Sequence, residues 1–251
     1  MVEHEATSLD AILGGRLRLR QTRDGHRVGL DAILLAAAAG APAARLVDVG
    51  AGVGAVGLAL LQRWPAATGA LIEIDPELAA LAEENAALND LADRARVVVA
   101  DALDAKSRRA AGLADEAADL VVTNPPYLAA DAARPSPDPR RARAHVAGAG
   151  AAALAGWVVA CLALVKPGGR FVMIHRADAL PALLPAFAGR LGDLALRPVH
   201  PRADAPAIRL LISGTKGSKA PLHVLPGLTL HEADGAAAPL AAAIQRGEAT
   251  L

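Results

Sequence analysis

The stretch Leu46-Val-Asp-Val-Gly50-Ala-Gly-Val-Gly54 decides how the rest of the sequence is read. Its first four residues form a short, mostly apolar run, which predicts a buried strand. The glycines that follow allow a tight turn and let the backbone approach a ligand closely. A helix is expected from about Gly54 to Arg63, because Pro65 ends it. Strand, glycine turn and helix in this order indicate a ligand site at the N-terminus of the helix.

Six further apolar runs predict strands, and most of them are separated by helical segments. The expected strands are 70–74, 96–100, 119–123, 170–174, 194–200 and 207–215, and the expected helices are 77–88, 151–165, 179–189 and 237–246. Alternating strands and helices form a mostly parallel sheet with helices on both faces. No helix separates the last two strands, so we expect an antiparallel pair at the edge of the sheet. The sequence therefore predicts an α/β fold with a seven-stranded sheet.

Several acids accompany the glycine turn. Glu73 follows the turn by about twenty residues, where a carboxylate suits the hydroxyl pair of a ribose. Asp48 would repel a pyrophosphate but attract the cationic methionine end of S-adenosylmethionine. Asp101 closes the third strand and can accept a hydrogen bond from an adenine amino group, whereas Asp75 is expected to cap the next helix. The glycines alone also fit a dinucleotide turn, so a nicotinamide dehydrogenase stays an alternative.

A second motif, Asn124-Pro125-Pro126-Tyr127, follows the fourth strand directly. Ligands bind beyond the carboxyl ends of strands in such sheets, so we expect this turn to lie beside the glycine turn. The prolines remove two backbone donors and leave two acceptors, the Asn124 amide oxygen and the Pro125 carbonyl. Two acceptors that hold the N–H bonds of a planar amine make its lone pair available for methylation, while Tyr127 stacks on the substrate. Adenine N6, guanine N2 and a glutamine amide all fit this description.

Charge is balanced over the 251 residues but is unevenly distributed. Residues 75–119 carry eleven acids and five basic residues, whereas residues 131–219 carry thirteen basic residues and five acids. A basic half predicts a phosphate-binding face. The apolar run 32–44 is too short to span a bilayer, and the N-terminus lacks a signal-peptide pattern, so we expect a cytoplasmic protein without a membrane partner. The apolar run 157–165 around Cys161 predicts that this cysteine is a buried core residue. The histidines show no metal-ligand spacing.

These motifs resemble the Asn-Pro-Pro-Tyr class of Rossmann-like methyltransferases, and more narrowly the bacterial tRNA1(Val) adenine-N6 methyltransferase family. The resemblance covers nearly the whole chain and is carried by residues 27–31, 48–54, 72–75, 100–101, 124–127 and 214–219. It implies S-adenosylmethionine as cofactor, a tRNA substrate, and methylation of an adenine next to the anticodon. We expect residues 1–44 to cover substrate and cofactor, and residues 45–251 to form the methyltransferase domain.

The candidate site residues fall into three groups. The catalytic candidates are Asn124, Pro125 and Tyr127. The cofactor-binding candidates are Asp48, Gly50, Gly52, Glu73, Asp101 and Asn124, with Gly29 and Asp31 from the first loop. The substrate-binding candidates are Pro126, Arg134, Arg140, Arg141, Arg143, Lys216 and Lys219. His145 fits an RNA contact and an ordinary surface position equally well. The basic members are expected to hold the RNA backbone.

Other functions stay open at this point. Protein-glutamine methyltransferases use the same turn but normally carry an N-terminal helical domain, and only residues 1–45 precede the first sheet strand here. A guanine-N2 RNA methyltransferase fits the turn equally well. A non-enzymatic RNA-binding module would not need the acceptor turn. The sequence does not indicate an oligomeric state.

Overall fold

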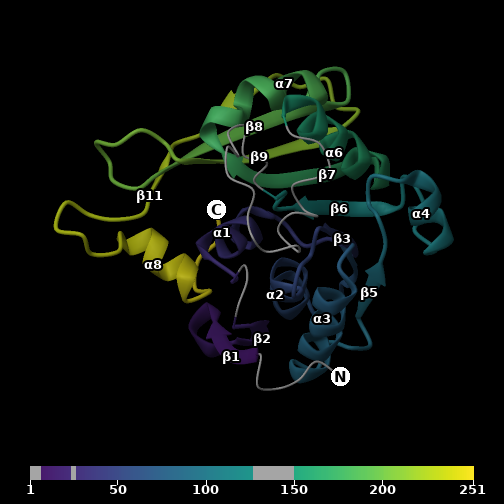
Figure 1. Ribbon diagram of the computed structural model, residues 1–251. Helices are drawn as coiled ribbons and strands as arrows, with labels where there is room; N and C mark the ends of the chain where they lie inside the picture. Colours follow the sequence, from purple (N-terminus) through teal and green to yellow (C-terminus); the bar gives the residue numbers. More distant parts are fainter. Residues whose placement is uncertain (1–6, 24–26, 127–149) are drawn as a thin grey trace.

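The computed structural model describes residues 7–23, 27–126 and 150–251 (Figure 1). Its strands are β1 (Thr7–Ile12), β2 (Leu17–Thr22), β3 (Arg45–Val49), β4 (Thr68–Glu73), β5 (Ala95–Val99), β6 (Ala118–Thr123), β7 (Val165–Arg176), β8 (Leu191–His200), β9 (Arg209–Lys216), β10 (His223–Val224) and β11 (Leu228–Thr229). Its helices are α1 (Leu30–Ala38), α2 (Ala55–Arg63), α3 (Pro76–Leu88), α4 (Ala105–Ala110), α6 (Ala151–Leu164), α7 (Leu180–Phe187) and α8 (Pro239–Gln245).

The central sheet has the strand order β10-β8-β9-β7-β6-β3-β4-β5, with β11 also paired to β8. Strands β5, β4, β3, β6 and β7 are mutually parallel, and β9 is antiparallel to both β7 and β8. The predicted α/β fold with a mostly parallel sheet is confirmed. The antiparallel strand lies between β7 and β8 rather than at the edge. After the crossover through α7, strand β8 runs parallel to β7 but one strand position away from it. Strand β9 fills the position between them and runs in the opposite direction.

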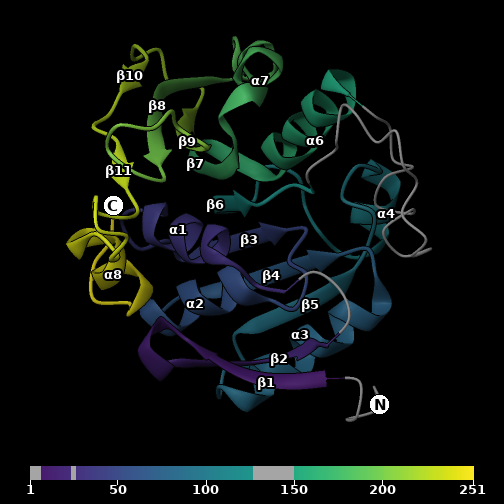
Figure 2. The same ribbon diagram turned by 60° about the vertical axis from the view of Figure 1, so that its left-hand side comes forward.

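Helices cover both faces of this sheet (Figure 2). Helices α1, α2 and α8 share one buried apolar cluster with one face of the central strands, and α3 joins it through Ala82 and Ala86. Helices α6 and α7 share a second cluster with the other face, centred on Phe171, Val121 and Val158. The burial of apolar side chains on both faces explains why β6 reads as a nearly continuous apolar run.

The N-terminal hairpin of β1 and β2 is absent from the sequence-based expectations. Leu17 and Leu19 are fully buried, whereas the arginine between them points outward, so β2 follows the two-residue period of a half-buried strand. The far edge of β2 is hydrogen bonded by side chains of α3. Asn85 and Asn89 each accept from one backbone N–H of β2 and donate to a carbonyl of the same residue, at 2.6 to 3.0 Å. The two asparagines therefore replace a neighbouring strand.

No helix in the described ranges is both long enough and apolar enough to cross a lipid bilayer.

Candidate active site

The glycine turn lies at the carboxyl end of β3, in the middle of the sheet. Gly50 and Gly52 have φ of 71° and 56°, a region in which side-chain-bearing residues are strained. The N–H groups of Gly50 and Ala51 both donate to Ile72 O at 2.9 Å, which ties the turn to β4. A Cβ added to Gly52 would meet no atom within 4 Å, so the turn faces open space there. Helix α2 begins at Ala55, with its N-terminus toward this turn.

Glu73 ends β4 beside the glycine turn and is nearly buried. Its Oε2 accepts from Gly52 N at 2.8 Å, and its Oε1 accepts from the N–H groups of Ile74 and Asp75 at 2.8 and 2.9 Å. These three bonds fix the carboxylate against the turn and leave Oε2 with acceptor capacity for a hydroxyl. The role of Asp75 as helix cap is confirmed, since its side chain accepts from Glu77 N.

Asp48 lies on the inward side of the turn. Only 1% of the residue is exposed, and its Oδ2 accepts from Gly57 N of α2 at 2.8 Å. Burial, with a smaller effect of the nearby Glu73 carboxylate, raises the pKa of Asp48 to about 7 despite that hydrogen bond. Asp48 therefore holds α2 against β3, and a direct contact with a cationic ligand stays a prediction.

Asp101 lies two residues beyond Val99, which pairs with Glu73 in the sheet. Its Oδ1 accepts from Leu103 N at 2.8 Å, and its own N–H donates to Ser107 Oγ at 3.0 Å. Exposed apolar side chains lie around the two acids: Ile74 is 65% and Leu103 38% exposed. Sequence reasoning did not identify this apolar rim, although Ile74 directly follows Glu73 and Leu103 lies two residues after Asp101. A planar, partly apolar group fits between such side chains.

The Asn-Pro-Pro turn follows β6 at the same edge of the sheet. Val49 and Thr123 are paired residues of β3 and β6, so the first residue after each strand belongs to one of the two turns. The amide oxygen Oδ1 of Asn124 is buried and has no hydrogen-bond partner among the described residues. Pro125 is buried and Pro126 is exposed. A buried acceptor without a partner is costly to a fold, and at an edge of this kind it marks a ligand position.

Trp157 of α6 joins the two turns and was not anticipated from the sequence. Its Nε1–H donates to Thr123 Oγ1 at 2.9 Å, and the Thr123 hydroxyl donates to Val49 O at 2.8 Å. Cys161, one helical turn further along α6, also hydrogen bonds to Thr123, and burial raises the pKa of its thiol. Cys161 is buried, as expected.

Gly29 and Asp31 lie at the N-terminus of α1. Gly29 is the N-cap residue, and Asp31 Oδ2 accepts from Arg209 Nε at 2.9 Å. Arg209 pairs with Arg176 at the carboxyl end of β7, which is the edge that also carries the two turns. The pair therefore anchors α1 to the correct edge of the sheet, and contact of either residue with a cofactor stays a prediction.

Lys216 and Lys219 lie at the opposite edge from Asn124. Thr215 pairs with Arg170 at the start of the ladder, whereas Ile212 pairs with Met173, the partner of Thr123. Lys216 Nζ donates to the carbonyls of Leu162 and Val165, each at 2.8 Å, and forms an ion pair with Glu116 at 2.9 Å. Strand β9 runs antiparallel and carries its C-terminal end, with these lysines, away from Asn124. Their contact with RNA stays a prediction.

The remaining sequence candidates lie outside the described residues. They are Tyr127, Arg134, Arg140, Arg141, Arg143 and His145.

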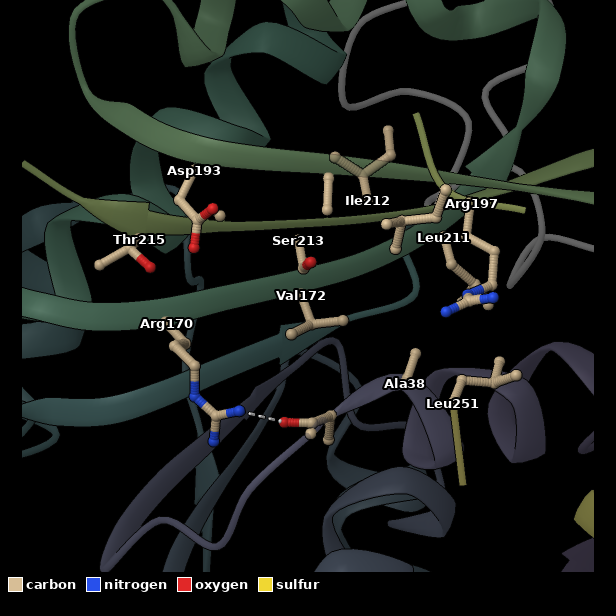
Figure 3. Close-up of a pocket in the computed structure, with 15 residues that line it drawn as sticks. Ala38, Arg170, Val172, Asp193, Arg197, Leu211, Ile212, Ser213, Thr215 and Leu251 are labelled. Atoms are coloured by element: carbon tan, nitrogen blue, oxygen red, sulfur yellow. Dashed lines mark hydrogen bonds between the residues drawn. The ribbon is translucent and has the colours of Figure 1, made fainter. Parts of the chain in front are cut away.

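A cavity of about 220 Å³ lies between the C-terminal end of α1 and strands β7, β8 and β9 (Figure 3). Arg170, Ser213 and Thr215 are among the side chains around it. A second hollow, of about 560 Å³, lies at the amino ends of β3, β4 and β5. Neither includes the glycine turn or Asn124, so both are separate from the site described above.

Comparison with known proteins agrees with this geometry. The family model described as "Methyltransferase small domain" matches residues 30–136, which include both turns. The tRNA1(Val) (adenine(37)-N6)-methyltransferase of Porphyromonas gingivalis is 34% identical over 168 residues, covering 65% of this chain and 64% of that protein. The release factor glutamine methyltransferase of Cereibacter sphaeroides is 34% identical over 173 residues, covering 64% of this chain and 59% of that protein. The chain thus spans less than two thirds of the length of these curated relatives.

A solved structure extends the match over most of the chain. It is that of a predicted O-methyltransferase from Agrobacterium tumefaciens, with 30% sequence identity and a TM-score of 0.72. The match covers 88% of this chain and 98% of that one. The expected resemblance to the tRNA1(Val) adenine-N6 methyltransferases is confirmed by the curated relatives. The chain therefore belongs to the Rossmann-like methyltransferases of the Asn-Pro-Pro-Tyr class.

Proposed function

We propose that the protein is an S-adenosylmethionine-dependent methyltransferase that acts on the N6 amino group of adenine in tRNA. The observation that carries the proposal is the buried, unpartnered Oδ1 of Asn124 beside the glycine turn. An acceptor in that position suits an N–H donor from a substrate. A cytoplasmic location is part of this proposal.

The glycine turn and its acids suit the cofactor. Gly50 and Gly52 let the backbone approach the ligand, and the partly occupied carboxylate of Glu73 has acceptor capacity for a ribose hydroxyl. Asp101 offers an oxygen to the adenine amino group, while Ile74 and Leu103 offer apolar surface to the ring. When bound, S-adenosylmethionine supplies an electrophilic methyl group on a sulfonium.

The Asn-Pro-Pro turn suits the methyl acceptor. Asn124 Oδ1 and the Pro125 carbonyl each accept one N–H of the target amine, which draws its nitrogen toward a pyramidal geometry and localises the lone pair. Tyr127 stacks on the planar base and holds it in line. The proton becomes acidic as the new N–C bond forms, so this arrangement requires no strong general base. A base in structured RNA must first leave its helix to reach the turn.

The nature of the larger substrate is inferred from charge and from the relatives. Two described arginines near this edge carry acid partners, in the pairs of Arg27 with Asp10 and Arg209 with Asp31. We therefore assign phosphate binding to Arg134, Arg140, Arg141 and Arg143, which follow the Asn-Pro-Pro-Tyr motif in sequence. The Porphyromonas relative named for tRNA supports this substrate class. We also keep the division into a covering segment, 1–44, and a methyltransferase domain, 45–251, as part of this proposal.

The test is incubation of the protein with methyl-labelled S-adenosylmethionine and total tRNA, followed by nucleoside analysis of the digest. We expect label in N6-methyladenosine. Asn124→Ala removes one of the two acceptors and should lower kcat by about 100-fold or more, the loss typical of a deleted transition-state hydrogen bond. Its affinity for S-adenosylhomocysteine should change little, which separates loss of catalysis from loss of fold. Label in N2-methylguanosine instead would show that the protein methylates guanine N2 and not adenine N6.

A glutamine amide is the second candidate substrate, because it offers the same NH2 group and the Cereibacter relative is named for that reaction. A release-factor peptide therefore belongs in the same experiment. Label in the peptide and none in tRNA would replace the RNA proposal with protein-glutamine N5 methylation.

A further inference from the structure

We propose that Trp157 is a positioning residue that sets the spacing between the cofactor turn and the Asn-Pro-Pro turn. The inference rests on the proposed function, since it assigns Trp157 a role in methyl transfer. Trp157 lies on α6, packed on one face of the sheet, while the turns belong to β3 and β6.

The indole reaches the substrate side through Thr123. Its Nε1–H donates to Thr123 Oγ1 at 2.9 Å, and this oxygen belongs to the residue directly before Asn124. The Thr123 hydroxyl in turn donates to Val49 O at 2.8 Å, and Val49 directly precedes Gly50. The indole N–H occupies an acceptor position of the hydroxyl, so its proton is directed toward Val49. One fully buried threonine therefore links the last residue of β3 with the first residue of the acceptor turn.

The same ring contacts the cofactor side directly. An ideal Cβ built on Gly50 would lie 3.0 Å from Cζ2 and 3.2 Å from Cη2 of Trp157. The six-membered part of the indole thus fills the space in which any other residue at position 50 would carry its side chain. Gly50 is restricted in two ways, by its φ of 71° and by this contact.

Methyl transfer is sensitive to this spacing. The reacting nitrogen is held from one turn and the methyl donor from the other, and misplacement by about 1 Å can cost two orders of magnitude in rate. Trp157 is hydrogen bonded to Thr123, the residue directly before the Asn-Pro-Pro turn, and its ring fills the space in which a side chain at position 50 would lie. Its loss should loosen their relative position, while the glycine turn stays tied to β4 by the backbone hydrogen bonds of Gly50 and Ala51.

The test compares Trp157→Phe with Trp64→Phe. Phenylalanine at 157 keeps an aromatic ring on α6 but removes both the N–H donor to Thr123 and the Cζ2–Cη2 edge that fills the space beside Gly50. Trp64 is the only other tryptophan in the sequence; it is 5% exposed and lies at the C-cap of α2, away from the turns. It therefore controls for loss of stability. We expect Trp157→Phe to lower kcat about tenfold, with the KM of the methyl acceptor and the affinity for S-adenosylhomocysteine changed less than threefold. Trp64→Phe should lower Tm without this loss of kcat.

A second pair of variants tests the link through Thr123. Thr123→Ser keeps the hydroxyl and should retain most of the activity, whereas Thr123→Val should resemble Trp157→Phe. If Trp157→Phe keeps the kcat of Trp64→Phe, Trp157 has no positioning role. The proposed function is tested separately by binding of S-adenosylhomocysteine. This binding is followed by tryptophan fluorescence in Trp64→Phe, in which Trp157 is the sole tryptophan. A wild-type protein that neither binds S-adenosylhomocysteine nor methylates tRNA or the release-factor peptide would overturn the function itself, whereas normal binding and turnover with an active Trp157→Phe would overturn only the positioning role.

Discussion

Asp48 is held between β3 and α2 with a pKa raised from 3.8 to about 7 by burial. The native state therefore binds a proton between about pH 4 and pH 7 that the unfolded chain has already released. Stability from this group is fully present below pH 4 and is lost as pH rises toward 7. A shift of this size corresponds to at most about 4 kcal/mol. We expect Asp48→Asn to reduce the fall in Tm between pH 5 and pH 8.

The measurement is thermal unfolding of both proteins across that range. Asp119 beside Lys166 has a lowered pKa and acts below pH 4. Burial also lowers the pKa of His175, which destabilises the fold as pH falls through the same window, but this effect is common to wild type and variant, so their difference reports Asp48. A variant with the same pH profile as wild type would mean that Asp48 is ionised in the folded protein at pH 5.

At this scale, residues next to a motif were predictable and residues across the sheet were not. Glu73 is the last residue of β4 and Asn124 directly follows β6. The carboxyl ends of parallel strands meet at one edge, so the proximity of both residues to the glycine turn follows from sequence order. The bond between Trp157 and Thr123 joins positions 34 residues apart, and it depends on how α6 packs on the sheet. No local pattern indicates it. Tyr127 and the arginines after it stay predictions.

At the scale of elements, the main sheet strands were predictable because each is a short apolar run that alternates with a helical segment. The hairpin of β1 and β2 was missed because its outer edge pairs with side chains of α3 rather than with another strand. Asn85 is fully buried and makes three hydrogen bonds, to the N–H and carbonyl of Arg20 and to the carbonyl of Val53 in the glycine turn. The hairpin is thus connected to the cofactor turn by one side chain.

We expect Asn85→Ala to destabilise the protein by about 2–3 kcal/mol, because it leaves buried backbone groups without partners. Asn89→Ala, at a more exposed position, should cost about 1 kcal/mol. Asn85→Ala should also weaken binding of S-adenosylhomocysteine, because Val53 loses its support, whereas Asn89→Ala should not. Urea unfolding and cofactor titration measure the two effects. If the two variants bind S-adenosylhomocysteine with equal affinity, Asn85 does not support the cofactor turn.

At the scale of the whole molecule, the described basic residues between 150 and 219 lie at both edges of the sheet, with Arg176 and Arg209 at the carboxyl edge and Lys216 at the amino edge. Lys216 lies about 16 Å along the sheet from the Asn-Pro-Pro turn, at five residues of extended strand, and its ammonium group caps carbonyls at the end of α6. Counts of charge along a chain ignore strand direction, and the antiparallel run of β9 moves its lysines to the other edge. The sequence thus predicts that a binding surface is basic better than it predicts which basic residues belong to that surface.

This division of charge gives a prediction for tRNA binding. Binding through phosphates should weaken with salt, and each lost phosphate contact lowers the slope of log K against log salt by about 0.7–0.9. We expect Arg140→Ala with Arg141→Ala to reduce that slope by about 1.5, if each arginine meets one phosphate. Lys216→Ala should leave affinity and slope unchanged while costing about 1–2 kcal/mol of stability through its lost hydrogen bonds. Titrations of labelled tRNA at several salt concentrations, with urea unfolding alongside, measure both. A reduced slope in Lys216→Ala would mean that the amino edge of the sheet also binds RNA. An affinity for tRNA that does not depend on salt concentration would contradict binding through phosphates.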